Sequence, residues 1–157
     1  MEDLAAYRAV ERKPIVGTYR GYTVYGPPPP SSGGITLMLM LNMLEPMELR
    51  KQGRHDARTL HRIVEVMRRA YADRARHLGD GDFVKIPTET LLSREYARKR
   101  ASDIDDDRTT PSAKVAPEIK LSDEKPSTTH YSVLDANGMA VSTTTTLEDS
   151  FGCRVVV

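Results

Sequence analysis

The chain has 157 residues, a length typical of one domain. Its 23 basic and 22 acidic residues leave a formal net charge of +1, which gives no overall attraction to nucleic acid or anionic membranes. No run of about 18 apolar residues predicts a membrane span, and no charged-then-apolar leader predicts a signal peptide in this chain. The single cysteine, Cys153, excludes an internal disulfide.

The first residues predict a short helix followed by a β-hairpin. Residues 2–10 have a helical pattern, and Pro14 then favours an extended backbone. Strand-like residues occupy 15–19 and 22–25, with Arg20-Gly21 between them as the expected turn.

A buried helix is predicted over residues 35–44. A serine precedes the apolar run, which is an N-cap signal, and the run is apolar nearly all round. The intervening Gly33-Gly34 lacks the spacing of a phosphate-binding loop. These glycines are interpreted as permitting close packing where the helix begins.

Residues 56–76 predict an amphipathic helix. Apolar residues recur on one face at helical spacing: Leu60, Ile63, Val64, Met67 and Tyr71. The other face is basic: Arg58, Arg62, Arg68, Arg69 and Arg76. A nucleic-acid-binding face is one interpretation. Glu65 and Asp73 interrupt the basic residues, so a solvated helix face is favoured.

The next segment predicts a turn and a further helix. Asp80-Gly81-Asp82 lacks the remainder of a calcium-binding loop and is interpreted as a turn with local hydrogen bonds. A helix is predicted over 88–104, after Pro87. None of the four histidines has metal-ligand spacing to a cysteine or carboxylate, so neither a metal nor a cofactor is predicted.

Residues 105–127 are interpreted as a flexible linker. They contain an acidic triplet, three prolines and scattered lysines, with few residues to bury. This linker leads directly into the most informative stretch of the chain.

Residues 128–147 predict a β-hairpin around Asn137-Gly138, a pair suited to a tight turn. A three-residue loop would pair Asp135 with Met139, and counting outward places Thr128 opposite Thr146. Directly opposed Cβ atoms lie about 5 Å apart, so the open end would bring two hydroxyls together. A two-residue loop would shift that pairing by one position.

The last residues, 151–157, read as an apolar strand, in which Cys153 is interpreted as a small buried side chain. Such a strand needs neighbours on both sides. The chain is therefore interpreted as part of a longer gene product.

Several motifs, in order, resemble the γ-glutamyltranspeptidase family. They are Glu-Asp-Leu-Ala-Ala-Tyr at 2–7, Tyr-Arg-Gly-Tyr at 19–22, Pro-Pro-Pro-Ser-Ser-Gly-Gly at 28–34, Ala-Tyr-Ala-Asp-Arg at 70–74, Leu-Gly-Asp-Gly-Asp-Phe-Val at 78–84, Ser-Thr-Thr-His-Tyr-Ser-Val at 127–133, Ser-Thr-Thr-Thr-Thr-Leu at 142–147 and Phe-Gly at 151–152. Together they cover nearly the whole chain.

The resemblance implies an α+β chain, part of the αββα sandwich of an N-terminal nucleophile hydrolase. It implies three regions: residues 1–104 from the large subunit, the linker 105–127, and residues 128–157 from the start of the small subunit. The family precursor cuts itself before a threonine, so the implied processing site is Ser127–Thr128.

The resemblance also implies roles for individual residues. Thr128 would be the nucleophile, and Thr146 would orient its amine or hydroxyl. Glu148 occupies a position that contacts the substrate's α-amino group in the family, where many members have asparagine. His130 shares the face of Thr128 on a strand, and either a catalytic contribution or a satisfied, partly buried side chain fits it.

The activity implied is transfer and hydrolysis of γ-glutamyl groups, with glutathione as substrate, an amine or water as acceptor, and large and small subunits as partners. Family resemblance places such enzymes in the periplasm or outside the cell. Alternatives are a related acylase acting on β-lactam side chains, a poly-γ-glutamate depolymerase, or an uncut, non-catalytic remnant. The 157 residues alone are expected to be inactive, because further substrate-binding and oxyanion residues lie outside them.

Overall fold

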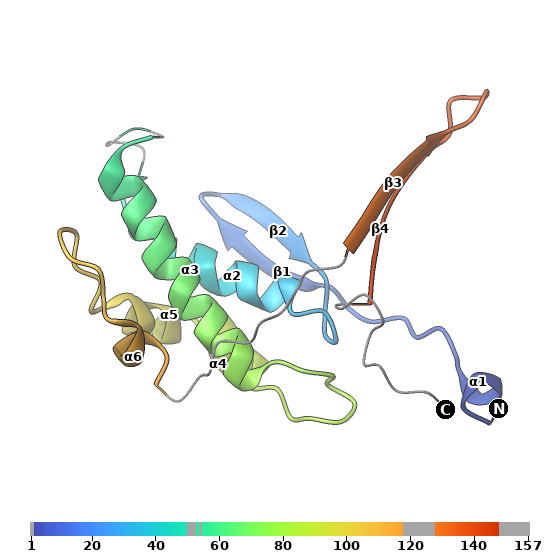
Figure 1. The fold of residues 1–157 in the computed structure, drawn as a ribbon, viewed down its shortest axis with the longest axis horizontal. Coiled ribbons are helices and arrows are strands. Elements are labelled where there is room, and N and C mark those ends of the chain that lie inside the picture. Colours follow the sequence, from blue (N-terminus) through green and yellow to red (C-terminus); the bar gives the residue numbers. More distant parts are fainter. Residues whose placement is uncertain (1, 50–52, 54, 118–127, 148–157) are drawn as a thin grey trace. The chain divides into compact units, whose positions relative to one another are not determined.

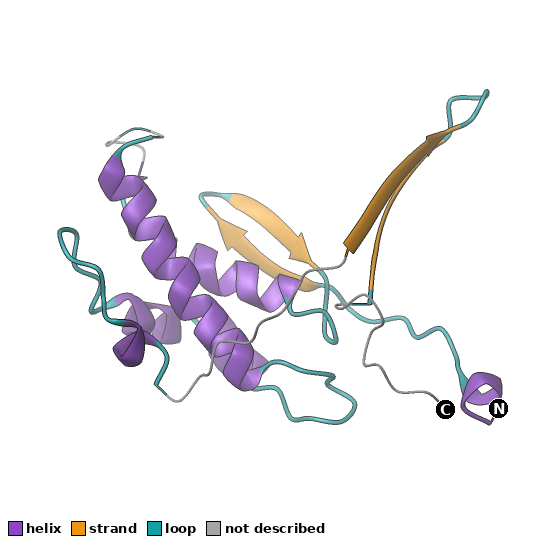
Figure 2. Cartoon of the chain, in the orientation of Figure 1, coloured by secondary structure: helices purple, strands orange, loops and turns teal. Residues whose placement is uncertain are grey.

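A computed structural model describes residues 2–49, 53, 55–117 and 128–147. The chain divides into two compact units, Met1–Ile119 and Lys120–Val157. In the described residues, the helices and one β-hairpin belong to the first unit, and a second hairpin belongs to the second (Figures 1 and 2). This mixture of helices and antiparallel strands confirms the α+β class.

The elements of the first unit follow the predicted order. They are α1 (Glu2–Ala6), β1 (Ile15–Tyr19), β2 (Tyr22–Gly26), α2 (Gly33–Leu44), α3 (Ala57–His77), α4 (Thr88–Leu92), α5 (Arg94–Ala101) and α6 (Ser112–Val115). The first helix is shorter than predicted. The β1–β2 hairpin is confirmed, with positive φ angles at Arg20 (51°) and Gly21 (86°) that suit a two-residue turn.

Helix α2 is the centre of the first unit, and its residues contribute to two apolar clusters. The first cluster joins α2 to α3 and α5 through Leu39, Met43, Val66, Ala70 and Ala97. The second joins α2 to β1 and α4 through Ile35, Met38, Ile15 and Leu91. A helix that is apolar nearly all round can serve both clusters at once, as its sequence predicted.

The start of α2 passes very close to the end of β2. A Cβ atom added at Gly34 would lie 2.3 Å from the carbonyl oxygen of Pro27, and one added at Gly26 would lie 2.6 Å from the Cα of Gly34. At Gly33 the nearest atoms are 3.5 Å away, which is ordinary contact. The interpretation that glycine permits close packing here is therefore confirmed at Gly34.

Gly34→Ala should destabilise the protein by about 1–3 kcal/mol, because its methyl group meets backbone atoms that cannot rotate away. Gly33→Ala is the matched control: it should be neutral or slightly stabilising, since alanine favours helix more than glycine does. Urea unfolding followed by the helical circular dichroism signal measures both. Equal midpoints for the two variants would contradict the packing argument.

Helix α3 begins at a clear cap and buries a different face from the one predicted. Asp56 caps it by accepting hydrogen bonds from the amides of Arg58 (2.9 Å) and Thr59 (3.3 Å). Four of the five residues of the predicted apolar face are instead 41–52% exposed: Leu60, Val64, Met67 and Tyr71. The buried positions are Thr59, Glu65, Val66, Arg69, Ala70, Ala72 and Asp73. The prediction of the core-facing side was wrong, because paired charged residues occupy it.

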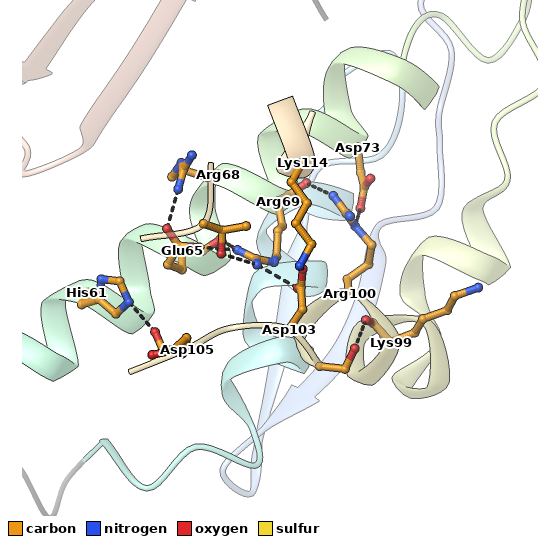
Figure 3. Close-up of polar contacts among 12 residues, drawn as sticks. His61, Glu65, Arg68, Arg69, Asp73, Lys99, Arg100, Asp103, Asp105 and Lys114 are labelled. Carbon is orange, nitrogen blue, oxygen red and sulfur yellow. Dashed lines mark hydrogen bonds and ion pairs between the residues drawn. The ribbon is translucent and has the colours of Figure 1, made fainter. Parts of the chain in front are cut away.

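Glu65 and Arg69 form the buried part of a polar network on α3 (Figure 3). Their side chains are at most 1% exposed, and Arg69 Nη1 donates to Glu65 Oε2 at 2.6 Å. Arg69 Nη2 donates to Asp103 Oδ1 at 2.8 Å and to Thr110 Oγ1 at 3.0 Å. Burial by itself raises the pKa of Glu65, but hydrogen bonds from Arg69, Thr110 and Arg68 outweigh it and hold that pKa below its usual value.

Residues 105–117, which the sequence assigned to a linker with little to bury, lie against α3. Arg62 pairs with Asp106, and Arg58 Nη2 pairs with Asp107 at 3.2 Å. Arg76 donates to the carbonyl of Pro117 at 3.2 Å. Thr110 and Val115 are buried, and α6 lies within this segment. The arginines predicted to form a solvated face are therefore largely paired by the downstream segment, and the nucleic-acid interpretation loses its support.

The predicted helix over 88–104 is interrupted at Ser93. Its backbone is extended (φ −73°, ψ 140°), and its hydroxyl accepts from the amide of Tyr96 at 3.1 Å, capping α5. Serine competes with helical hydrogen bonding in this way, which explains why α4 and α5 are separate. Nearby, burial and the charge of Asp73 raise the pKa of Tyr96 to about 12.

Candidate functional site

The second unit contains the hairpin of β3 (Thr128–Leu134) and β4 (Ala140–Thr146). Its turn is a three-residue loop: the amide of Asp135 donates to Met139 O at 3.0 Å, and the amide of Gly138 donates to Asp135 O at 3.2 Å. Gly138 has φ +84°, and the Asp135 carboxylate accepts from the amides of Asn137 and Met139. The predicted Asp135–Met139 pairing is confirmed.

This turn places Thr128 opposite Thr146, as counted from the sequence. Hydrogen-bonded and non-hydrogen-bonded residue pairs alternate along an antiparallel ladder, and side chains approach more closely at the non-hydrogen-bonded pairs. Because Asp135 and Met139 form a hydrogen-bonded pair, the non-hydrogen-bonded pairs are 134–140, 132–142, 130–144 and 128–146. Thr128 Oγ1 donates to Thr146 Oγ1 at 3.1 Å. The candidate nucleophile therefore has its hydroxyl oriented by a second hydroxyl across the strands.

The same face continues as a row of polar side chains. His130 Nδ1 lies 2.7 Å from Thr144 Oγ1, and His130 Nε2 lies 3.1 Å from Ser142 Oγ. Ser132 Oγ is 3.3 Å from Ser142 Oγ. His130 is exposed rather than partly buried, and both of its ring nitrogens have hydroxyl partners.

Ser142 and Thr144 had no function predicted from the sequence. Their signal was nevertheless present, because counting outward from the turn places Thr144 opposite His130 and Ser142 opposite Ser132. Thr129 pairs with Thr145 and Tyr131 with Thr143, on the opposite face from the polar row.

Some predicted residues lie outside the described part of the chain. These are Ser127, Glu148, and the strand 151–157 with Cys153. Within the described residues, no group of three or more histidine, cysteine or acidic side chains is placed to hold a metal ion. No helix among them combines the length and apolarity needed to cross a membrane.

A surface pocket of about 540 Å³ lies among the described residues of the first unit. Its lining is Pro46, Met47, Glu48, Arg62, Ala101, Ile104 and Asp106. The Arg62–Asp106 ion pair in its wall belongs to the contacts that hold residues 105–117 on α3. In Asp106, the hydrogen bond from Arg62 lowers the carboxyl pKa.

The mixture of helices and antiparallel hairpins fits the fold class of the N-terminal nucleophile hydrolases, and comparison with known proteins supports that class. The family model described as Gamma-glutamyltranspeptidase matches residues 1–157. The chain is 48% identical over 155 residues to the glutathione hydrolase proenzyme of Escherichia coli (strain K12), covering 99% of this chain and 27% of that protein. The chain belongs to the gamma-glutamyltranspeptidase family.

A solved structure and an acylase are also similar to this chain. The crystal structure of Helicobacter pylori gamma-glutamyltranspeptidase has a TM-score of 0.71 and 41% identity, over 78% of this chain and 36% of that one. The acylase ACY 1 proenzyme of Pseudomonas sp. (strain SE83) is 39% identical over 155 residues, which are 99% of this chain and 27% of that protein. The chain spans about a quarter of the length of these curated relatives.

Proposed function

We propose that this chain contributes the nucleophile of a γ-glutamyl transferase and glutathione hydrolase that activates itself by cleavage between Ser127 and Thr128. The observation that carries the proposal is the hydrogen bond from Thr128 Oγ1 to Thr146 Oγ1, at 3.1 Å, at the open end of the hairpin. Supporting it are the family match along the whole chain and the relatives named as glutathione hydrolase proenzymes.

The first step is self-cleavage. Thr128 Oγ attacks the carbonyl carbon of Ser127, the peptide C–N bond breaks, and the proton of the hydroxyl ends on the freed amine. The resulting ester is hydrolysed by water, which leaves a carboxylate on Ser127 and restores the Thr128 hydroxyl. The hydrogen bond to Thr146 supports this step by holding the hydroxyl in one orientation.

Cleavage changes the chemistry of Thr128. A threonine hydroxyl is a weak nucleophile without an adjacent base. The freed α-amine has an unperturbed pKa of about 7.7–8.0, which suits a general base near neutral pH. The amine takes the proton as Oγ attacks the γ-carbonyl of the substrate, and then delivers it to the departing amine. Water or an acceptor amine next releases the γ-glutamyl group from the threonyl ester.

Glu148 is proposed to bind the α-amino group of the γ-glutamyl substrate, since a carboxylate pairs favourably with an ammonium. The carboxylate distinguishes this chain from family members with asparagine at that position. The large and small pieces of one precursor are the proposed partners. Residues 1–104 and the segment 105–127, whose first part packs against α3, would lie ahead of the cut, and residues 128–157 would begin the small subunit. A periplasmic or extracellular location is proposed on the same family grounds.

A related acylase is the second candidate, and one observation favours it: the 39% identity to the acylase ACY 1 proenzyme. The two candidates share the threonine chemistry and differ in the acyl group transferred. Comparing a γ-glutamyl anilide with a β-lactam side-chain amide as substrates for the same preparation separates them.

The test is N-terminal sequencing and intact mass of the full-length precursor encoded by the gene. The expected result is a new fragment that begins Thr-Thr-His-Tyr, together with p-nitroaniline release from γ-glutamyl-p-nitroanilide. The 157 residues alone serve as the control and should release none. A folded precursor that shows no new terminus at residue 128 would overturn the proposal.

A further inference from the structure

Four consecutive threonines, residues 143–146, make the pairing at the open end of the hairpin ambiguous. In the observed register Thr146 faces Thr128. If β3 shifted by one residue against β4, Thr145 would face Thr128 and Thr143 would face His130. Both positions would still offer a β-branched side chain with a hydroxyl, so the threonines themselves hardly distinguish the two registers.

The turn holds the register at the closed end only. Asp135 and Gly138 fix the loop through backbone and side-chain hydrogen bonds, and Asp135 lies seven residues along the chain from Thr128. A β-bulge in β3 between the turn and the open end would shift the remaining pairs by one residue and leave the turn unchanged. Something beyond the turn must therefore select Thr146 over Thr145.

His130 makes contacts that differ between the two registers. Its Nδ1 lies 2.7 Å from Thr144 Oγ1 and its Nε2 lies 3.1 Å from Ser142 Oγ. After a one-residue shift, Thr143 would replace Thr144 as a hydroxyl partner, but Val141 would replace Ser142, and valine has no hydrogen-bonding group. His130 Nε2 also lies 3.4 Å from Ser132 Oγ on its own strand, a contact that both registers keep. The imidazole thus loses one of its two cross-strand contacts in the wrong register.

We infer that His130 is a positioning residue, which selects the strand register that puts the hydroxyl of Thr146, and not of Thr145, opposite Thr128. It acts by contacting Thr144 and Ser142, which lie two and four residues along β4 from Thr146, while His130 itself lies two residues along β3 from Thr128. One net hydrogen bond corresponds to roughly a two- to tenfold preference between registers. This inference rests on the proposed function for its consequence, because the hydroxyl pair matters only if Thr128 reacts.

The test compares the self-cleavage rates of four full-length precursors. His130→Ala should cleave at least about threefold more slowly than the unaltered chain. Adding Thr143→Val and Thr145→Val should restore the rate to within about twofold, because valines remove both hydroxyls that stabilise the shifted register while keeping the β-branched shape. The same two valines with His130 intact form the control and should leave the rate unchanged.

The rescue separates positioning from direct chemistry. If His130 moved a proton during the reaction, or only stabilised the fold, valines on the opposite face would not compensate for its loss. Unchanged cleavage in His130→Ala, or no rescue by the valines, would overturn the inference.

A second readout does not depend on cleavage. With Cys153→Ser, cysteines introduced by Thr129→Cys and Thr145→Cys lie directly opposite in the observed register, where a short bis-methanethiosulfonate can join the two thiols with loss of two sulfinate groups. His130→Ala should lower the cross-linked fraction at least about twofold. Equal fractions would overturn the inference even if the precursor cleaves. Failure of the unaltered precursor to cleave would overturn the proposed function alone.

Discussion

Thr128→Ala is expected to leave the full-length precursor uncut and to lower γ-glutamyl transfer by at least about 10³-fold, since removing a nucleophile removes the covalent route. Alanine lacks the Oγ that donates to Thr146, so neither self-cleavage nor acyl transfer has an attacking atom. Intact mass measures the first effect, and p-nitroaniline release from γ-glutamyl-p-nitroanilide measures the second.

Two variants serve as controls for Thr128→Ala. Thr128→Ser keeps a hydroxyl and should retain slow cleavage at the same bond. Thr129→Val changes the neighbouring threonine, which pairs with Thr145 on the opposite face, and should cleave within about twofold of the unaltered rate. A new terminus at residue 128 in the alanine variant would show that another group breaks the bond.

Glu65→Gln is expected to destabilise the first unit by about 3 kcal/mol, because it leaves Arg69 buried without its nearest carboxylate. The two side chains are at most 1% exposed, so water cannot replace the lost charge. Asp103 remains bonded to Arg69, which keeps the loss at the lower end of the usual range. The measurement is the urea midpoint of the helical circular dichroism signal, since all described helices belong to this unit.

Asp107→Asn is the matched control, because it removes a carboxylate from an ion pair whose acidic side chain is 75% exposed. Its effect should stay within about 0.5 kcal/mol. Replacing Glu65 and Arg69 together by methionine should cost less than Glu65→Gln alone, since no unpaired charge is left in the core. Similar losses for Asp107→Asn and Glu65→Gln would show that burial does not govern this network.

The hairpin was predictable in detail because its register follows from local rules. Asn137-Gly138 marks the turn, and once a three-residue loop and strands without a bulge are assumed, counting outward gives every pair of β3 and β4. The β1–β2 hairpin and the extent of α2 and α3 followed from equally local patterns. Periodicity and turn residues act over a few positions, so they can be read without knowing the tertiary structure.

The orientation of α3 was not predictable in the same way. Its stripe of large apolar residues and the stripe that contains Glu65, Val66 and Arg69 both have helical spacing. Apolarity alone favours the first stripe. The second is buried because Arg69 finds Glu65 on its own helix and Asp103 some thirty residues later. An ion pair between residues so far apart in the sequence does not change the local pattern of hydrophobicity.

The same reasoning explains the misreading of residues 105–117. Aspartates and prolines in succession are typical of an unpacked linker. Here the aspartates form ion pairs with arginines on α3, so the segment is held in place by charge pairing more than by buried apolar side chains. Only the two segments considered together reveal this.

The attachment of residues 103–117 to α3 limits what maturation can set free. Asp103, Asp106 and Pro117 are bonded to arginines far upstream. Scission ahead of Thr128 would therefore leave this anchorage intact. The ten residues 118–127 reach at most about 35 Å when fully extended. The new carboxyl terminus would stay covalently attached to the first unit. It would therefore remain at high local concentration and would not diffuse away after cleavage.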